Sequence, residues 1–251
     1  MPTTQEVLDK ITEHEKWVGN PANGTRLDLI NEDLTQVDDT VFFERVLCEG
    51  QFNGAVISGK DFRGANCEGA NFAGASLLDC SLYRAKFTQC DFSNANLRRA
   101  CGHHAIWDRC DFTGADLREV DMRHSNFDQC DFTDALMSRA PGDSHLAAAD
   151  FSYCNMTACL FIRTNTRRAV MVGVDMTGST MTTGPFHHTD FSDAVFANVL
   201  LTTPDFTAAI FRAAAISGRT DFATAVMDEA TVQYTTLDRS GEKYEPKSAP
   251  E

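Results

Sequence analysis

The chain has 251 residues, and 36 Asp and Glu against 22 Lys and Arg give it a formal net charge of −14 at pH 7. Such an acidic balance argues against direct binding to nucleic acid, because the phosphates repel carboxylates. No apolar run approaches the ~18 residues of a membrane helix and no leader-like apolar segment is present, so we expect a cytoplasmic protein without a membrane partner.

Residues 3–18 are expected to form an amphipathic helix. Thr3 and Glu6 have the spacing of a capping box, in which each side chain binds the backbone N–H of the other residue. Apolar residues recur along one side of this helix, at Val7, Leu8, Ile11 and Val18. We therefore assign residues 1–24 to a capping helix and its connector.

From Phe62 onward, a large apolar residue recurs every five positions, with a small residue two places before it. Residues 89–92, 109–112 and 129–132 read QCDF, RCDF and QCDF, so the same phrase returns every 20 residues. Neither the helical period of 3.6 nor the strand period of 2 fits this spacing. The repeat instead predicts a solenoid, in which each unit contacts only its neighbours.

The five-residue units resemble the pentapeptide repeat family, whose consensus is a small residue, Asp or Asn, Leu or Phe, and two polar or small residues. Residues 70–74 (ANFAG) and 115–119 (ADLRE) match this consensus directly. The resemblance covers residues 25–237 and implies an all-β solenoid, a right-handed quadrilateral β-helix in which four pentapeptides make one square coil. About ten coils would then stack ~4.8 Å apart.

Residues 20 positions apart would lie above one another in such a stack. We therefore expect one internal column of aromatic side chains, formed by Phe52, Phe72, Phe92, Phe112 and Phe132. A second column is expected on the next face, formed by Leu77, Leu97, Leu117 and Met137. The segment with Leu8, His14 and Trp17 resembles the N-terminal caps of bacterial members, which favours a His14 packed under Trp17 over a ligand or base.

The five-residue spacing is lost at residues 35–41, 140–144 and 217–219. The register is one residue short between Met137 and Leu146, and one residue long around Gly218. Each break is either a tolerated insertion or deletion or a projecting loop that carries function. Gly102 occupies a central position without a side chain, for which a local bulge is the simple account. Residues 238–251 are polar and are expected to form a flexible tail.

Most of the cysteines occupy inward positions. Cys67 is a large-residue centre, and the small inward position is taken by Cys80, Cys90, Cys110, Cys130, Cys154 and Cys159. This pattern predicts reduced thiols that pack as small apolar groups rather than disulfides or zinc ligands.

Two histidine pairs, residues 103–104 and 187–188, are the other candidates for chemistry. They should lie four coils apart, roughly 20 Å by the coil spacing, which excludes a joint metal site and favours solvent-exposed histidines. No catalytic motif is present, so we expect neither an enzyme nor a cofactor.

Charge is distributed unevenly over the expected faces. The face of Phe92, Phe112 and Phe132 carries aspartates without Lys or Arg, whereas the next face carries Arg98, Arg99, Arg118 and Arg139 against Asp116 and Glu119. If the break near residue 140 loses no unit, the acidic face continues beyond it, with Asp91, Asp111, Asp131 and Asp150 stacked in successive coils. The candidate protein-interaction residues are then Asp91, Asp111, Asp131, Asp134, Asp150, Asp190 and Asp193. The alternative is that Asp is simply the habitual residue of the family at this position.

Two functions are compatible with these features. The first is a non-enzymatic scaffold or effector-like module that binds a basic protein partner through a rigid, partly acidic rod. The second follows from members of the family that mimic duplex DNA and bind DNA gyrase or topoisomerase IV, inhibiting the enzyme or protecting it from quinolone-type drugs. The net charge suits such a mimic, whereas the arginine-bearing face and the lack of a dimerising C-terminal end argue against it. A monomer and an end-to-end dimer both stay open.

Overall fold

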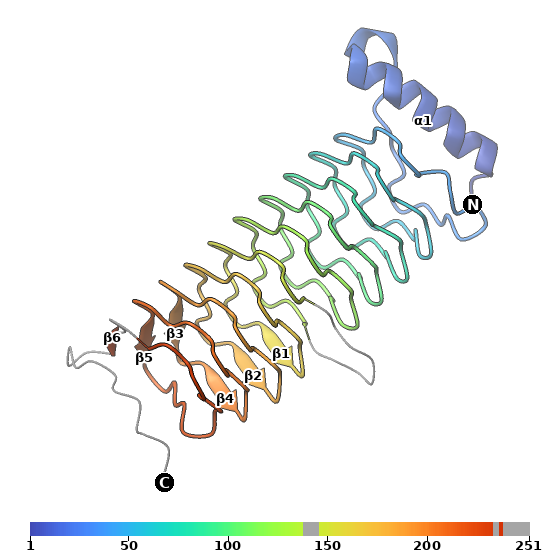
Figure 1. Ribbon diagram of the computed structural model, residues 1–251. Helices are drawn as coiled ribbons and strands as arrows, with labels where there is room; N and C mark the ends of the chain where they lie inside the picture. Colours follow the sequence, from blue (N-terminus) through green and yellow to red (C-terminus); the bar gives the residue numbers. More distant parts are fainter. Residues whose placement is uncertain (138–145, 233–235, 238–251) are drawn as a thin grey trace.

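The computed structural model describes residues 1–137, 146–232 and 236–237, which form one straight stack of coils with helix α1 at its N-terminal end (Figure 1). Helix α1 spans Thr4–Gly19 and is followed by the 3-10 turn η1, Pro21–Asn23. Extended segments long enough to count as strands occur near the C-terminal end, at β1 (Leu160–Ile162), β2 (Thr180–Thr182), β3 (Val195–Ala197), β4 (Leu200–Thr202), β5 (Ala215–Ser217) and β6 (Thr236–Leu237). They form two parallel sheets with strand orders β1-β2-β4 and β3-β5-β6.

Single parallel bridges connect the remaining coils. Asp91 pairs with Asp111, and Asp111 pairs with Asp131, at the 20-residue spacing expected from the sequence. Between bridges the chain turns: the N–H of Ala95 donates to the carbonyl oxygen of Phe92 over 3.0 Å. The corner residue is left-handed, with φ of 56° at Asn94, a conformation that Asn and Gly adopt more readily than most residues. Each five-residue unit is thus one short extended segment and one tight turn.

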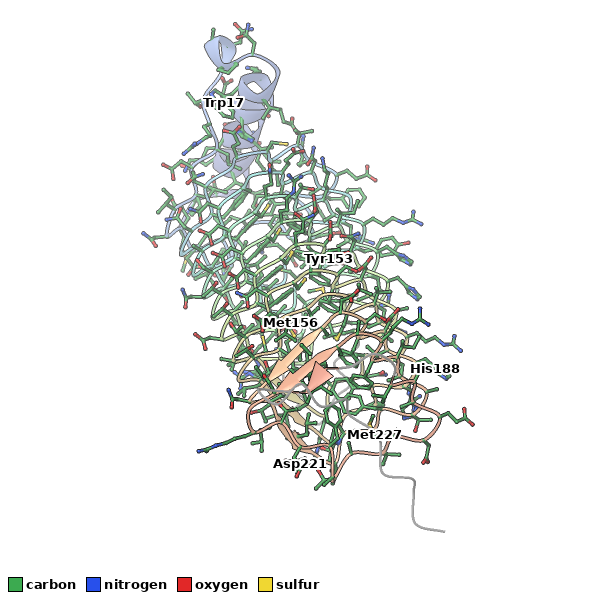
Figure 2. The ribbon with its side chains drawn as sticks, turned by 90° about the vertical axis from the view of Figure 1, so that its left-hand side faces the viewer. Trp17, Tyr153, Met156, His188, Asp221 and Met227 are labelled. Atoms are coloured by element: carbon green, nitrogen blue, oxygen red, sulfur yellow. The ribbon has the colours of Figure 1, made fainter. Side chains whose placement is uncertain are left out.

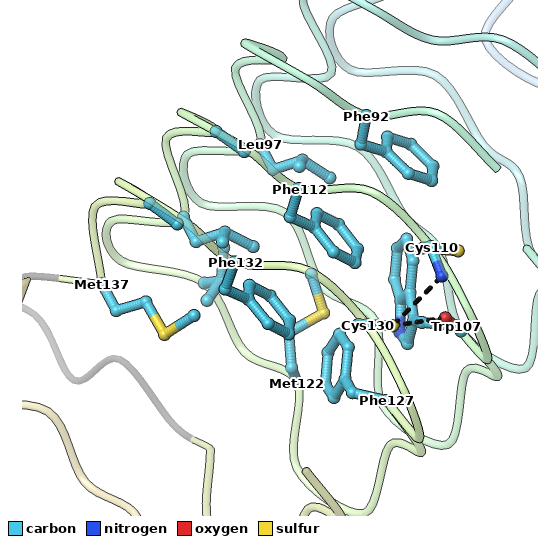
Figure 3. Packing of buried hydrophobic residues seen from close by; sticks show 14 of the residues in the cluster. Phe92, Leu97, Trp107, Cys110, Phe112, Met122, Phe127, Cys130, Phe132 and Met137 are labelled. Atoms are coloured by element: carbon cyan, nitrogen blue, oxygen red, sulfur yellow. Dashed lines mark hydrogen bonds between the residues drawn. The ribbon is translucent and has the colours of Figure 1, made fainter. Parts of the chain in front are cut away.

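The interior is built from columns of identical or similar side chains. Phe72 and Phe92 stack with ring centroids 4.8 Å apart, and Phe112 and Phe132 stack at 4.7 Å. Figure 3 shows Phe92, Phe112 and Phe132 aligned along the stack, with Leu97 and Met137 in the next column. The two predicted columns are confirmed, as is the repeat solenoid with its N-terminal helix. Its handedness and the number of coils stay predictions.

Gly102 does not form the bulge that its missing side chain suggested. Its N–H donates to the carbonyl oxygen of Asp121 over 2.8 Å, so the ladder continues without interruption. A Cβ at Gly102 would lie 2.4 Å from the sulfur of Met122 and 3.2 Å from the indole of Trp107. These two large neighbours fill the space, and the prediction of a bulge is therefore wrong.

The inward cysteines are free thiols that pack in the core, as predicted. The six cysteines at the small inward position each donate to a carbonyl oxygen of the preceding coil. Cys110 Sγ lies 2.6 Å from the oxygen of Phe87, and Cys130 Sγ lies 2.7 Å from that of Trp107 (Figure 3). Burial raises the pKa of the Cys80 thiol to about 12 and the pKa of Cys110 well above its usual range. A buried thiolate is disfavoured because the apolar interior cannot solvate its charge.

Helix α1 covers the first coils through Val7, Ile11 and His14, all fully buried. The capping box of Thr3 and Glu6 is present, as predicted. Val18, which was expected on the buried side of the helix, is only half-buried, and His14 is buried there instead.

His14 accepts a hydrogen bond at Nδ1 from the N–H of Leu27 over 3.0 Å, and its ring stacks on Trp17 at 5.6 Å. Burial lowers the pKa of His14 and keeps the imidazole neutral. The histidine packed under Trp17 is confirmed.

The break at residues 35–41 is an insertion. Asp33 pairs with Val56, 23 positions later, whereas Val46 pairs with Asn66 at the regular spacing. Lys60, only 1% exposed, extends its ammonium group to this segment and donates to the carbonyl oxygen of Val37 over 2.8 Å. The same group contacts the Asp39 carboxylate at 2.6 Å. The buried ammonium group of Lys60 thus connects the insertion to the next coil along the chain.

The second break was misread from the sequence. Asp131 pairs with Asn155, 24 positions later, and Asp150 pairs with Asn126. The chain therefore gains four residues here instead of losing one, and every later residue lies one face away from its predicted place. The predicted break at 140–144 and the predicted tail at 238–251 themselves lie outside the described residues.

The third break is confirmed as one additional residue. Asp205 pairs with Val226 and Ile210 pairs with Thr231, both 21 positions apart. Gly218 lies within this extra length with φ of 68°, a conformation suited to glycine.

Candidate protein-interaction surface

The outward residues around the Phe92, Phe112 and Phe132 centres form what we call the acidic face. It comprises Asp91, Ser93, Asn94, Asp111, Thr113, Gly114, Asp131, Thr133 and Asp134. The parallel bridges place Asp91, Asp111 and Asp131 in one column. Asp111 and Asp134 are exposed, and Asp91 and Asp131 are half-buried.

Each stacked aspartate has a local structural role. Oδ1 of Asp91, Asp111 and Asp131 accepts the backbone N–H two residues later, over 2.8, 2.8 and 2.9 Å. This contact closes the turn and explains why the family favours Asp or Asn before each centre. Asn71 makes the same hydrogen bond to the N–H of Ala73 over 2.9 Å. The turn therefore requires an acceptor oxygen but does not require a charge.

The charge of the acidic face is not balanced locally. Within the described residues, no Lys, Arg or His lies within 4.0 Å of the carboxylates of Asp91, Asp111 or Asp131. Equivalent aspartates on other faces are paired: Asp116 with Arg118 at 2.5 Å, and Asp121 with Arg123 at 2.9 Å. Like charges ~5 Å apart repel by up to about 1 kcal/mol in water before screening by salt. The stacked carboxylates thus carry a small cost that asparagines would avoid.

The seven predicted aspartates do not form one surface. Asp134 lies in the turn that follows Asp131, on the acidic face. Asp150 and Asp190 belong to the column of Asn126, and Asp193 lies beside Asp190, so all three occupy the neighbouring face. The predicted stacking of Asp150 on Asp131 is wrong, because it depended on the register across the second break.

The register also adds a residue that the sequence reasoning missed. Asp131 pairs with Asn155, which pairs with Asp175, so Asp175 extends the acidic face two coils further. Its Oδ1 accepts the N–H of Thr177 over 2.9 Å, as in the other turns. Counting back in steps of 20 from Val195 would have identified it, provided that the break was treated as an insertion.

The arginines expected on the adjacent face are largely neutralised. Arg99 binds Asp79 of the preceding coil at 2.6 Å, and Arg98 binds Glu119 of the following coil at 2.9 Å. Arg139 lies outside the described residues. Such exposed ion pairs contribute at most about 1 kcal/mol each, but they cancel the positive charge next to the acidic face.

The two histidine pairs lie on the face opposite the acidic one. Backbone hydrogen bonds connect the successive coils between the two pairs: residue 104 to 123, 124 to 147, 148 to 167, and 168 to 187. The pairs therefore lie four coils apart, as predicted. His103 contacts Asp121 at 2.6 Å and His187 contacts Asp205 at 2.5 Å. In the part of the chain that the structure describes, no group of three or more His, Cys, Asp or Glu could hold a metal ion.

The described residues also contain no helix long and apolar enough to cross a membrane.

Both the sequence and the fold resemble known proteins. The family model for Pentapeptide repeats matches in eight copies, over residues 61–99, 103–134 and 144–182. HetL from the cyanobacterium Nostoc sp., a pentapeptide repeat protein involved in heterocyst differentiation regulation, is 17% identical, with 92% of this chain and 98% of HetL covered and a TM-score of 0.40. No curated protein matches the chain significantly.

Two further solved structures resemble the chain. A trypsin-treated form of QnrB1, a plasmid-mediated fluoroquinolone resistance protein, is 19% identical over 86% of this chain and 93% of that chain, with a TM-score of 0.42. A pentapeptide repeat protein from the thylakoid lumen of Arabidopsis thaliana is 28% identical over 45% of this chain and 68% of that chain, with a TM-score of 0.24.

Proposed function

Because the chain belongs to the pentapeptide repeat family, we propose that it is a non-enzymatic protein-interaction module whose acidic face binds a basic protein partner. The observation that carries this proposal is the column of Asp91, Asp111 and Asp131, which have no cationic neighbour among the described residues. Asparagine would close the same turns without repulsion, as Asn71 does. The negative charge is therefore explained by a partner rather than by folding.

The shape of the acidic face suits a close approach. Its remaining outward positions carry small side chains, such as Ser93, Thr113 and Gly114. The carboxylates repeat at ~4.8 Å along a straight line. Three residues of an α-helix rise about 4.5 Å, so a helix with Lys or Arg on one side can place its cations opposite successive aspartates.

The contact can be located with a photo-crosslinking amino acid at Thr113, in the middle of the acidic face. The matched control is Thr207, the same residue type at the equivalent turn position of the opposite face. We expect crosslinks from Thr113 to a protein with a cationic surface, and their loss when Asp91, Asp111 and Asp131 are all changed to Asn. Equal crosslinking from Thr207, or crosslinks that survive the three Asn changes, would contradict the proposal.

A mimic of duplex DNA that binds DNA gyrase or topoisomerase IV is the second candidate function. It is favoured by the straight rod, the acidic column and the net charge of −14. It is opposed by exposed arginines on the opposite face, Arg167 and Arg168. A gyrase supercoiling assay separates the two candidates: an effect of the native chain that the three Asn changes abolish would support the mimic, and no effect would eliminate it.

A further inference from the structure

A hollow of about 490 Å³ lies on the face opposite the acidic one. Ala147 and Ala148 form its floor, because they fill the two outward positions of a coil whose neighbours carry long side chains there. The N–H of His124 donates to the oxygen of Ala147 over 3.3 Å, and the N–H of Ala148 donates to the oxygen of Arg167 over 2.9 Å. The alanine pair therefore leaves a gap one coil wide between an N-terminal and a C-terminal wall.

Both walls present nitrogen-bearing side chains. His124 lies on the N-terminal side of the alanines, and Arg167 and Arg168 lie on the C-terminal side, with His187 and His188 in the next coil. Figure 2 shows His188 on the outer surface of the rod. Arg167, Arg168 and His188 are exposed, so their polar groups are accessible to a ligand.

The two arginines differ from most others on the rod. Arg63, Arg118 and Arg123 each form a close ion pair with a nearby aspartate. No carboxylate of the described residues lies within 4.0 Å of the guanidinium group of Arg167 or Arg168. Two arginines that are consecutive in the chain and unpaired within the described residues therefore border a hollow whose floor is neutral, in a protein that is strongly acidic as a whole.

We propose that this hollow binds a small molecule that carries phosphate groups. The planar guanidinium group presents a fork of N–H donors that matches phosphate oxygens, and the imidazoles of His124 and His188 add further donors, whereas His187 is held by Asp205. The coils above and below the floor are two spacings apart, ~10 Å, which leaves room for a phosphate between the walls. The volume falls within the range typical of small-molecule sites, about 300–1,000 Å³.

This site is independent of the acidic face. It lies on the opposite side of the rod, takes ligands of opposite charge and shares none of its residues. The protein would thus recognise a cationic partner on one side and an anionic ligand on the other.

Isothermal titration of the full chain with tripolyphosphate at low ionic strength tests the proposal. We expect saturable binding with one site per chain, and at least a tenfold loss of affinity in the double variant Arg167→Gln/Arg168→Gln. The matched control is Arg212→Gln/Arg219→Gln, which removes the same charge from exposed positions elsewhere on the rod. It should reduce affinity by less than about twofold, as expected for long-range electrostatics screened by salt.

A third variant separates a shaped site from general charge attraction. Ala147→Leu fills the floor without changing the charge, and it should also weaken tripolyphosphate binding at least tenfold while leaving the thermal unfolding midpoint nearly unchanged. The proposal is overturned if tripolyphosphate does not saturate, if the control pair weakens binding as much as the test pair, or if Ala147→Leu has no effect. Equal affinity for citrate would also overturn it, since the site would then recognise charge and not phosphate.

Discussion

The acidic face and the opposite face use the same turns but balance their charges differently. On the acidic face, Asp91, Asp111 and Asp131 close their turns without a cationic neighbour among the described residues. On the opposite face, Asp121 accepts the backbone N–H of Arg123 over 3.5 Å to close its turn, and it also contacts the side chains of Arg123 and His103. The turn therefore fixes the position of an acceptor oxygen, whereas the surrounding side chains fix the charge of each face.

Both faces rest on a common core. The largest change in stability that we expect comes from the thiols of this core as the pH rises. The seven inward thiols are all buried, and burial raises their pKa. A thiol whose pKa is raised on folding is protonated in both states below the unfolded value of about 8.5, so the stability is fully retained there. As the pH rises above that value only the unfolded chain ionises, and the stability is lost until the folded pKa is reached. Each affected thiol lowers the free energy of unfolding by roughly 1 kcal/mol per pH unit, so the seven together should lower it by about 10 kcal/mol between pH 8.5 and 10.

Denaturant titrations across this pH range measure the loss. Replacing Cys90, Cys110 and Cys130 together by Ala should make the decline with pH clearly shallower, whatever it does to stability at pH 7. A decline of unchanged steepness would show that these thiols ionise as readily in the folded state as in the unfolded chain.

The next largest change in stability is expected when a core residue beneath the acidic face is truncated. Phe112 is fully buried between Phe92 and Phe132, with ring centroids at 5.2 and 4.7 Å. Phe112→Ala should cost about 3–5 kcal/mol, because a core one side chain thick cannot close the cavity.

The matched change on the surface is Asp111→Asn, which should alter stability by no more than about 0.5 kcal/mol. Asn keeps the acceptor for the N–H of Thr113 and removes only the charge. Urea unfolding of the two variants tests both values. Similar losses would mean that the charge of Asp111 is needed for folding, which would remove the main argument for a partner.

A smaller change is expected on the opposite face, in the pKa of Asp121. Burial opposes ionisation of Asp121, but hydrogen bonds from Arg123 and His103 outweigh it and lower its pKa. A carboxyl whose pKa is lowered on folding stabilises the protein above its unfolded pKa, and this stabilisation is lost as the pH falls through the folded value. Arg123→Gln should therefore raise the pKa of Asp121 in an NMR titration. Arg98→Gln, on another face, should leave it unchanged.

The sequence predicted the repeat because each centre must be apolar and each corner must turn. It could not assign the faces beyond Met137, because Leu146 fits the apolar pattern whether the chain loses one residue or gains four. Only the pairing of Asp131 with Asn155 distinguishes the two cases. This explains why Asp150, Asp190 and Asp193 were placed on the wrong face and why Asp175 was missed.

Contacts between coils were also hidden from the sequence. The pairing of Arg99 with Asp79 joins residues 20 positions apart, whose side chains meet only if they lean toward each other. The hollow over Ala147 and Ala148 required the same correction of the register, because its walls lie on both sides of the second break.

The role of the acidic face is tested by the rate at which the purified partner associates with the chain. This rate is compared between the native chain and the variant Asp91→Asn/Asp111→Asn/Asp131→Asn. Electrostatic steering acts mainly on association, so the variant should bind at least about tenfold more slowly at low salt, and the difference should shrink as salt rises. The control variant, Asp150→Asn/Asp190→Asn/Asp193→Asn, changes the net charge equally on the neighbouring face and should change the rate much less. An unchanged rate in the first variant, or equal slowing in both, would contradict a specific role for the acidic face.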